Sequence, residues 1–252
     1  MVFVTGDCHA NWKKFSIKSF PIQRELTRDD YVIVCGDFGL WHKNKTEQWW
    51  LKWFTTKKFT ILFVDGNHEN FDRLYSKEFE VVDFHGGKAH KIRENVYHLM
   101  RGYVFELCGK KFFTFGGASS HDIDDGILDM DDFESAEAFV ETYRQWCKQN
   151  KMFRVNHYSW WSQELTSQDE MDFGLKTLEE HDYKVDYVIS HCLPQAIAVV
   201  MGYRGADILT MYFNKLIENG LEFKEWYAGH YHRNERVLGK YYVLYEDILR
   251  IV

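Results

Sequence analysis

Short apolar runs, each followed by a glycine or an aspartate and then by polar residues, recur through the first seventy positions of the chain. The runs are rich in β-branched and aromatic residues and lie at residues 2–4, 31–34 and 60–64. Nearly continuous apolar runs of this length are typical of strands that are buried on both faces. Helix-compatible stretches at about 11–20 and 46–57 separate them. The pattern therefore predicts a βαβαβ unit with parallel strands.

The rest of the chain predicts further strands and helices. The expected strands lie at 103–107, 111–115 and 187–190, and in a terminal hairpin around 238–240. The expected helices lie at about 133–149, 168–181 and 206–219. Two local signals support the helices. Ser167 and Glu170 form a capping-box pattern, and Gly220 is a stop signal.

The stretch from about 119 to 166 has a different composition. It holds seven carboxylates between Asp122 and Glu134 and later an aromatic Tyr-Ser-Trp-Trp segment at 158–161. We interpret it as an insertion or cap beside a single domain that spans residues 1–252. The acidic run does not match an EF-hand loop. Counting from Asp122 places Gly126 at the fifth position, whereas the calcium loop requires glycine at the sixth.

Composition and charge narrow the class of protein. A chain of 252 residues can bury a large core without disulfides. Its five cysteines are odd in number and widely spaced, which favours a reducing compartment. No segment resembles a signal peptide or a membrane span, so we expect a cytoplasmic location and no membrane contact. The net charge of −7 argues against binding of duplex nucleic acid and leaves open a small phosphorylated substrate held by metal ions.

Five polar segments lie at the ends of predicted strands. They are Gly6-Asp7-Cys8-His9, Gly36-Asp37, Gly66-Asn67-His68-Glu69, Ser190-His191 and Gly229-His230-Tyr231-His232. A single Asp or His after a strand is usually a turn former or a helix cap, but turn preference does not account for five. Functional groups of α/β sheets gather beyond the carboxyl ends of the strands. Mixed imidazole and carboxylate donors suit Mn, Fe, Zn or Ni better than Ca, so we expect a transition-metal site here.

In this order the segments resemble the motifs of the calcineurin-like metallophosphoesterase superfamily, which read D-x-H, G-D, G-N-H-[DE], H and G-H-x-H. The resemblance runs from Asp7 to His232. It implies an α/β fold, a four-layer α/β/β/α sandwich, and a site for two divalent metal ions, of which Mn is the first expectation. One ion would be held by Asp7, His9, Asp37 and His232. The second would be held by Asp37, Asn67, His191 and His230, with Asp37 as the bridge.

The same resemblance implies hydrolysis of phosphate esters by a metal-activated water. Asp37 and His68 would be the catalytic residues, with His68 either protonating the leaving group or helping to hold the phosphate. We expect a phosphodiesterase or a nucleotide-type phosphatase. Many relatives carry an Asp that supports the catalytic histidine, and the protein Ser/Thr phosphatases have an Arg after it. Here those positions are Leu40 and Trp41, so phosphoprotein phosphatase activity is not expected, and Glu69 or a backbone carbonyl would have to orient His68.

The segment 116–122, together with Ser159-Trp160-Trp161, resembles small bacterial and phage members of the superfamily, and this likeness does not specify the substrate. We expect a small phosphorylated substrate, with a nucleotide as one option. The expected substrate contacts are Asn67, His68 and Arg101. Arg154, Asn156 and His157 also suit a phosphate, although a surface or structural role is the more usual one for each of these residues and for Arg101.

Two other functions stay open from the sequence. A nuclease acting on short single-stranded nucleic acid is one, since Trp160 and Trp161 suit stacking on a base as well as core packing. A non-catalytic scaffold on the same fold is the other. The retention of His68 and of all seven ligand positions weighs against the scaffold.

Overall fold

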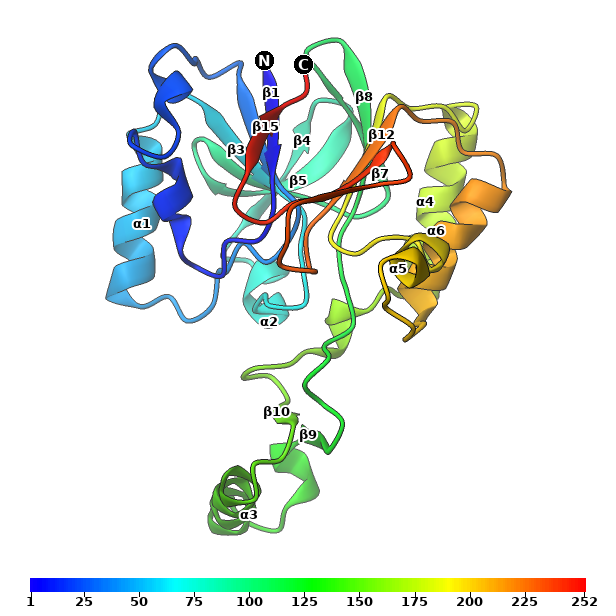
Figure 1. Cartoon of the computed structure of the whole chain (residues 1–252). Helices are drawn as coiled ribbons and strands as arrows, with labels where there is room; N and C mark the ends of the chain where they lie inside the picture. The colour runs from blue at the N-terminus through cyan, green and yellow to red at the C-terminus, as the bar shows by residue number, and fades with distance from the viewer.

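The computed structural model describes residues 1–252, and its centre is a pair of stacked β-sheets (Figure 1). The first sheet has the strand order β15-β1-β2-β3-β6-β5-β4. Its strands are β1 (Val2–Thr5), β2 (Tyr31–Val34), β3 (Thr60–Phe63), β4 (Glu80–Phe84), β5 (Gly87–Arg93), β6 (Val96–Leu99) and β15 (Ile248–Arg250). The second sheet has the order β13-β14-β12-β11-β8-β7. Its strands are β7 (Tyr103–Leu107), β8 (Lys110–Phe115), β11 (Tyr187–Ser190), β12 (Glu225–Ala228), β13 (Glu235–Val237) and β14 (Tyr241–Val243).

Helices cover the two outer faces of this pair of sheets (Figure 1). The first sheet is covered by α1 (Lys45–Thr55) and by two 3-10 turns, Trp12–Phe15 and Pro21–Arg24. The second sheet is covered by α4 (Gln168–Glu180), α5 (Gln195–Val200) and α6 (Ile208–Glu218). The short helix α2 (Phe71–Leu74) follows β3. None of the helices is both long enough and apolar enough to cross a membrane.

Each early strand is buried on both faces because its alternate side chains enter two different cores. Phe3, Val34 and Phe63 belong to the core beneath α1. Val4 and Leu62 belong to the core between the two sheets. A third core lies between the second sheet and the helices α4 and α6. The predicted four-layer α/β/β/α sandwich is therefore confirmed, as are the parallel pairings of β1 with β2 and of β2 with β3.

Three local predictions differ from the structure. Residues 11–20 form no α-helix but only the short 3-10 turn Trp12–Phe15, because Trp12, Phe15 and Phe20 are fixed by burial in the core beneath α1 and Pro21 opens a separate 3-10 turn. The strands β4, β5 and β6 were not predicted, since β4 exposes much of its length at the edge of the sheet and carries no apolar run. The helix α5 was also not predicted. Its six residues are too few for a periodic signal.

Residues 119–166 leave the sandwich and form a long projection, which we call the arm (Figure 1). The arm contains two short parallel strands, β9 (Gly126–Leu128) and β10 (Phe153–Val155), and the helix α3 (Ala136–Lys148). No residue of α3 is buried. The arm carries ten Asp and Glu residues against four Lys and Arg, so six of the seven excess negative charges of the chain lie on it.

Candidate metal centre

The five polar segments meet in space, because the ends of β1, β2, β3, β11 and β12 lie at one edge of the two stacked sheets. Four of the residues that they bring together adopt left-handed backbone conformations, with φ of 46° at His9, 49° at Asp37, 67° at His230 and 50° at His232. Such conformations are costly for non-glycine residues and concentrate at functional sites. Tertiary packing therefore holds these loops in shapes that local preference opposes.

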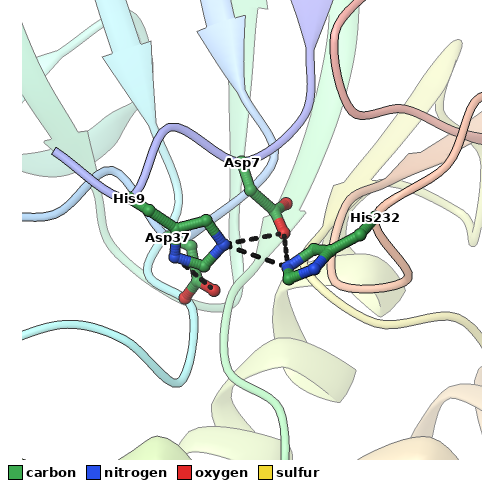
Figure 2. Close-up of side chains that lie close together, drawn as sticks. All are labelled: Asp7, His9, Asp37 and His232. Atoms are coloured by element: carbon green, nitrogen blue, oxygen red, sulfur yellow. Dashed lines mark hydrogen bonds and ion pairs between the residues drawn. The ribbon is translucent and has the colours of Figure 1, made fainter. Parts of the chain in front are cut away.

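Asp7, His9, Asp37 and His232 form a compact cluster (Figure 2). One donor atom from each of the four residues lies within 4.8 Å of the donor atoms of the others. Oδ2 of Asp7 is 3.6 Å from Nε2 of His9 and 3.2 Å from Nε2 of His232. Nδ1 of His9 is 3.6 Å from Oδ2 of Asp37. The arrangement is a candidate metal site made of two carboxylates and two imidazoles.

A second set of donors lies on the other oxygen of Asp37. Nε2 of His191 is 3.4 Å from Oδ1 of Asp37 and 3.2 Å from Oδ1 of Asn67. The ring of His230 lies 5.0 Å from the ring of His191. Nδ1 of His191 is 2.7 Å from the carbonyl oxygen of Cys35, which only accepts hydrogen bonds. In neutral His191 the proton therefore sits on Nδ1, and Nε2 presents a lone pair toward Asp37 and Asn67.

The two carboxylates of the centre are buried and ionised, so they need positive charge beside them. The side chains of Asp7 and Asp37 are buried, with 0% and 1% of their surface exposed. Burial raises the pKa of Asp7, but hydrogen bonds from His232 and His9 outweigh it, and the pKa lies well below its usual range. Burial likewise opposes ionisation of Asp37, but the charge of His191 lowers the pKa of Asp37 to about 2. In the metal-free protein the imidazoles balance this charge: burial lowers the pKa of His191, but Asp37 and Asp7 outweigh it and raise that pKa to about 10. Divalent metal ions bound by these residues would supply the positive charge instead and leave His191 neutral.

Two glycines of the motifs make room for these side chains. A Cβ at Gly36 would overlap the imidazole of His191, and Gly36 also has φ of +93°. A Cβ at Gly229 would overlap Oδ1 of Asp7. The backbone N–H of His230 also donates to Asp7, at 2.9 Å to Oδ1. Glycine is therefore required by the close approach of a candidate ligand from another loop.

Comparison with known families agrees with this geometry. The family model for calcineurin-like phosphoesterases matches residues 1–234 of the 252. The chain belongs to the calcineurin-like phosphoesterase family. Members of this family are metal-dependent hydrolases of phosphate esters. No curated protein is significantly similar to the chain.

In this chain, His68 lies above the cluster and contacts an arginine from the arm. Its ring centroid is 5.1 Å from that of His9, and its backbone N–H donates to Oδ1 of Asp37 at 2.7 Å. Nη2 of Arg154 is 3.2 Å from Nε2 of His68. Burial lowers the pKa of His68 to about 4, and Arg154 adds to this effect, whereas Asp37 opposes it. His68 is therefore neutral at neutral pH in the metal-free protein.

The expectation that Glu69 orients His68 is wrong. The buried carboxylate of Glu69 accepts hydrogen bonds from the backbone N–H groups of Phe38, Gly39 and Leu40. It therefore holds the loop that carries Asp37. Among the side chains close to His68, Arg154 is the one that hydrogen-bonds its ring.

The assignment of Arg101 to the substrate is also wrong. Arg101 is buried, and its guanidinium donates to Oδ2 of Asp65 from both Nε and Nη2. Its other N–H groups donate to the carbonyl oxygens of Gln163 and Leu165 and to Glu170. All five donors of the guanidinium have protein acceptors, so Arg101 has none left for a phosphate.

Trp161 does not present its ring for stacking on a base. It is 1% exposed, and its Nε1 donates to Oδ2 of Asp72 at 2.7 Å. The nearby His157 also contacts Asp72. These contacts fasten the arm to the sandwich.

Sequence reasoning missed His121, whose Nε2 lies 2.7 Å from Nε2 of His230. A signal for it exists in the sequence. The strand β8 ends at Phe115 and is followed by Gly116-Gly117, so the residues after it form a sixth polar segment at a strand end. The signal is weak because five residues separate His121 from the end of the strand.

Proposed function

We propose that this protein hydrolyses small phosphate esters with two divalent metal ions, as a phosphodiesterase or a nucleotide-type phosphatase. The observation that carries the proposal is the position of Asp37, whose two oxygens face two different sets of donors. Asp7, His9 and His232 would hold one ion with Asp37, and Asn67, His191 and His230 would hold the other. Imidazole, carboxylate and amide donors together suit Mn, and Fe, Zn or Ni are the alternatives.

Two bound divalent ions would supply Lewis acidity that activates water and neutralises charge on the phosphoryl oxygens. The protein's own residues prepare the centre for this. Lys14 donates to the backbone carbonyls of Gly6 and Asp7 at 3.2 and 2.8 Å and also to that of Tyr245. It therefore fixes the Asp7 loop against the C-terminal segment. Glu69 fixes the Asp37 loop in the same manner.

We assign His68 to holding the substrate phosphate, together with Asn67. The support is its partner, since an arginine has only donors and the imidazole nitrogen that faces Nη2 of Arg154 at 3.2 Å must accept. A histidine supported by a carboxylate would instead be favoured as an imidazolium and a proton donor. His68 would therefore lie beside the phosphate as a neutral imidazole that accepts from Arg154 at Nε2.

The surroundings of the site support a small substrate. The arm, with most of the excess negative charge of the chain, begins beside the metal centre. Long polyanions would be repelled there, whereas a single phosphate between two ions would not. All five cysteines are free thiols, which supports a reducing compartment such as the cytoplasm.

The test is metal-dependent activity of the wild type and of Asp37→Asn. Purified protein would be loaded with Mn, freed of excess metal and analysed for metal content. It would then be assayed on phosphomonoesters, phosphodiesters and cyclic nucleotides. We expect close to two ions per chain in the wild type, and loss of most of both ions and of activity in Asp37→Asn. Asp83→Asn is the control, because its side chain is 87% exposed and remote from the centre. Full metal content and activity in Asp37→Asn would overturn the bridging assignment.

A further inference from the structure

Two neighbouring residues at the base of the arm contact residues of the metal centre, and a third holds an arginine that reaches His68. Nδ2 of Asn67 donates to Oγ of Ser120 at 3.3 Å. Nε2 of His121 lies 2.7 Å from Nε2 of His230. Asp122 pairs with Arg154, which reaches His68. The base of the arm is therefore a wall of the site and is not remote from it.

The wall is rigidly held. Glu164, which is 1% exposed, accepts from the backbone N–H of Ser120 at 2.8 Å and from its hydroxyl at 2.6 Å. The two segments that enter and leave the arm are thereby tied together directly beside Asn67. A side chain bound to these residues therefore has a defined position relative to the metal centre.

Arg154 is a cation that Asp122 of this wall holds beside His68. It lies on β10 and is only 9% exposed. Its Nε and Nη2 atoms contact the two oxygens of Asp122 at 2.6 and 3.0 Å, and its Nη1 donates to the carbonyl oxygen of Ser159 at 3.0 Å. Three of its five N–H donors are thus used by the arm itself. The two that are left, one on each Nη atom, face the ring of His68.

His68 cannot satisfy both of these donors. Its Nε2 is 3.2 Å from Nη2 and its Nδ1 is 3.5 Å from Nη1. A neutral imidazole accepts at one nitrogen only, because the other carries the proton, and an imidazolium accepts at neither. At least one N–H of Arg154 therefore has no acceptor within the protein. This contrasts with Arg101, whose five donors are all engaged.

We propose that Arg154 is a binding residue for the substrate phosphate and that Asp122 is the residue that positions it. The proposal rests on the proposed function, since it places a phosphate at the metal centre. An oxyanion there would supply the acceptor that His68 cannot, and a guanidinium presents paired N–H groups that match two phosphate oxygens. The arm supplies this cation from a segment 86 positions after His68 in the chain.

The experiment measures phosphate binding apart from turnover. Mn-loaded wild type, Arg154→Met, Arg154→Lys and Asp122→Asn would be titrated with inorganic phosphate by calorimetry, and metal content would be measured on the same samples. We expect Arg154→Met to weaken phosphate binding about 10- to 100-fold, as expected for loss of a charged hydrogen-bond donor. Arg154→Lys should weaken binding less, because lysine keeps the positive charge but lacks the paired N–H donors of the guanidinium. Asp122→Asn should cause a smaller loss, since the arginine would remain but lose its anchor.

The matched control is Arg144→Met, which removes an exposed arginine from α3 of the same arm. It should leave phosphate binding and metal content unchanged. Addition of guanidinium ion at a concentration that does not unfold the protein should restore phosphate binding to Arg154→Met and not alter that of Arg144→Met. A merely structural role for Arg154 would not give this rescue.

Two results would overturn the proposal. One is phosphate binding by Arg154→Met that is as tight as that of the wild type, with metal retained. The other is an equal loss in Arg144→Met. Neither result bears on the proposed function, which fails separately if the Mn-loaded wild type hydrolyses no phosphate ester in the panel. In that event the calorimetric comparison still decides whether Arg154 binds phosphate.

Discussion

The carboxylate of Glu69 accepts a hydrogen bond of 2.6 Å from the backbone N–H of Phe38. The last residue of the Gly66-Asn67-His68-Glu69 segment therefore holds the loop of the Gly36-Asp37 segment. Its two oxygens also accept from the N–H groups of Gly39 and Leu40. Asp37 precedes this loop in a left-handed conformation. Glu69, the acidic residue that ends this segment, therefore stabilises the backbone of the Asp37 loop.

The first prediction concerns this contact. Glu69→Ala would leave buried N–H groups at 38–40 without acceptors, at a cost of about 1–3 kcal/mol for each unsatisfied group. We expect the free energy of unfolding of metal-free protein to fall by about 3 kcal/mol or more, the lower end of the sum for three groups, as measured by urea denaturation. Glu69→Gln keeps one acceptor oxygen and should lose less. Equal stability of Glu69→Ala and wild type would show that the contact does not hold the loop.

The second prediction concerns Gly229. A Cβ at position 229 would overlap Oδ1 of Asp7. Gly229→Ala must therefore displace the carboxylate of Asp7, which is a candidate metal ligand. We expect the affinity for Mn to fall by about 10- to 100-fold, the usual effect of disturbing a group that supports a ligand. Gly205→Ala is the matched control, because nothing lies within 4 Å of its Cβ position. Metal titrations should therefore give a lower Mn affinity for Gly229→Ala than for Gly205→Ala. Identical affinities would mean that Asp7 is not held in this position.

The third prediction separates two roles for His68. A phosphate ligand should matter about equally for all leaving groups, whereas a proton donor typically contributes about 10²–10⁴-fold only where the leaving group needs a proton. We expect His68→Asn to reduce the rates for nitrophenyl esters and for alkyl or nucleoside esters by similar factors, with metal content retained. A loss confined to the alkyl and nucleoside esters would instead establish His68 as the general acid. Loss of metal would place His68 among the ligands.

The fourth prediction concerns substrate size. The carboxylates of the arm between Asp122 and Glu134 give the arm a negative charge that should repel a polyanion. At equal phosphate concentration, we expect hydrolysis of small esters to be faster than cleavage of duplex DNA. Replacing Asp131, Asp132 and Glu134 by their amides should raise the cleavage of DNA at low salt and leave the hydrolysis of small esters unchanged. Efficient cleavage of duplex DNA by the wild type at physiological salt would favour a nuclease instead.

Much of the fold and of the candidate site was predictable from sequence because it depends on local order. The strands β1, β2 and β3 are continuous apolar runs, and each ends in the polar residues that later meet. The capping box at Ser167 and Glu170 and the glycine turn of the β7–β8 hairpin were also local signals, and both are present. Where the carboxyl ends of parallel strands share one edge, the order of motifs along the chain is enough to bring Asp7, Asp37 and Asn67 together.

Only the tertiary structure decided the contacts that depend on a distant segment. Arg101 and Arg154 are chemically the same in the sequence, but a buried carboxylate and carbonyl oxygens take every donor of Arg101. Arg154 keeps at least one donor without a protein acceptor because the arm places it over His68, a residue 86 positions earlier in the chain. Likewise, the spacing of residues 11–20 suited a helix, and burial of Trp12 and Phe15 against α1 and the first sheet overrode it. Residue type and order determined which groups reach the end of the sheets, whereas burial and hydrogen-bond saturation determined which of them remain available for a ligand.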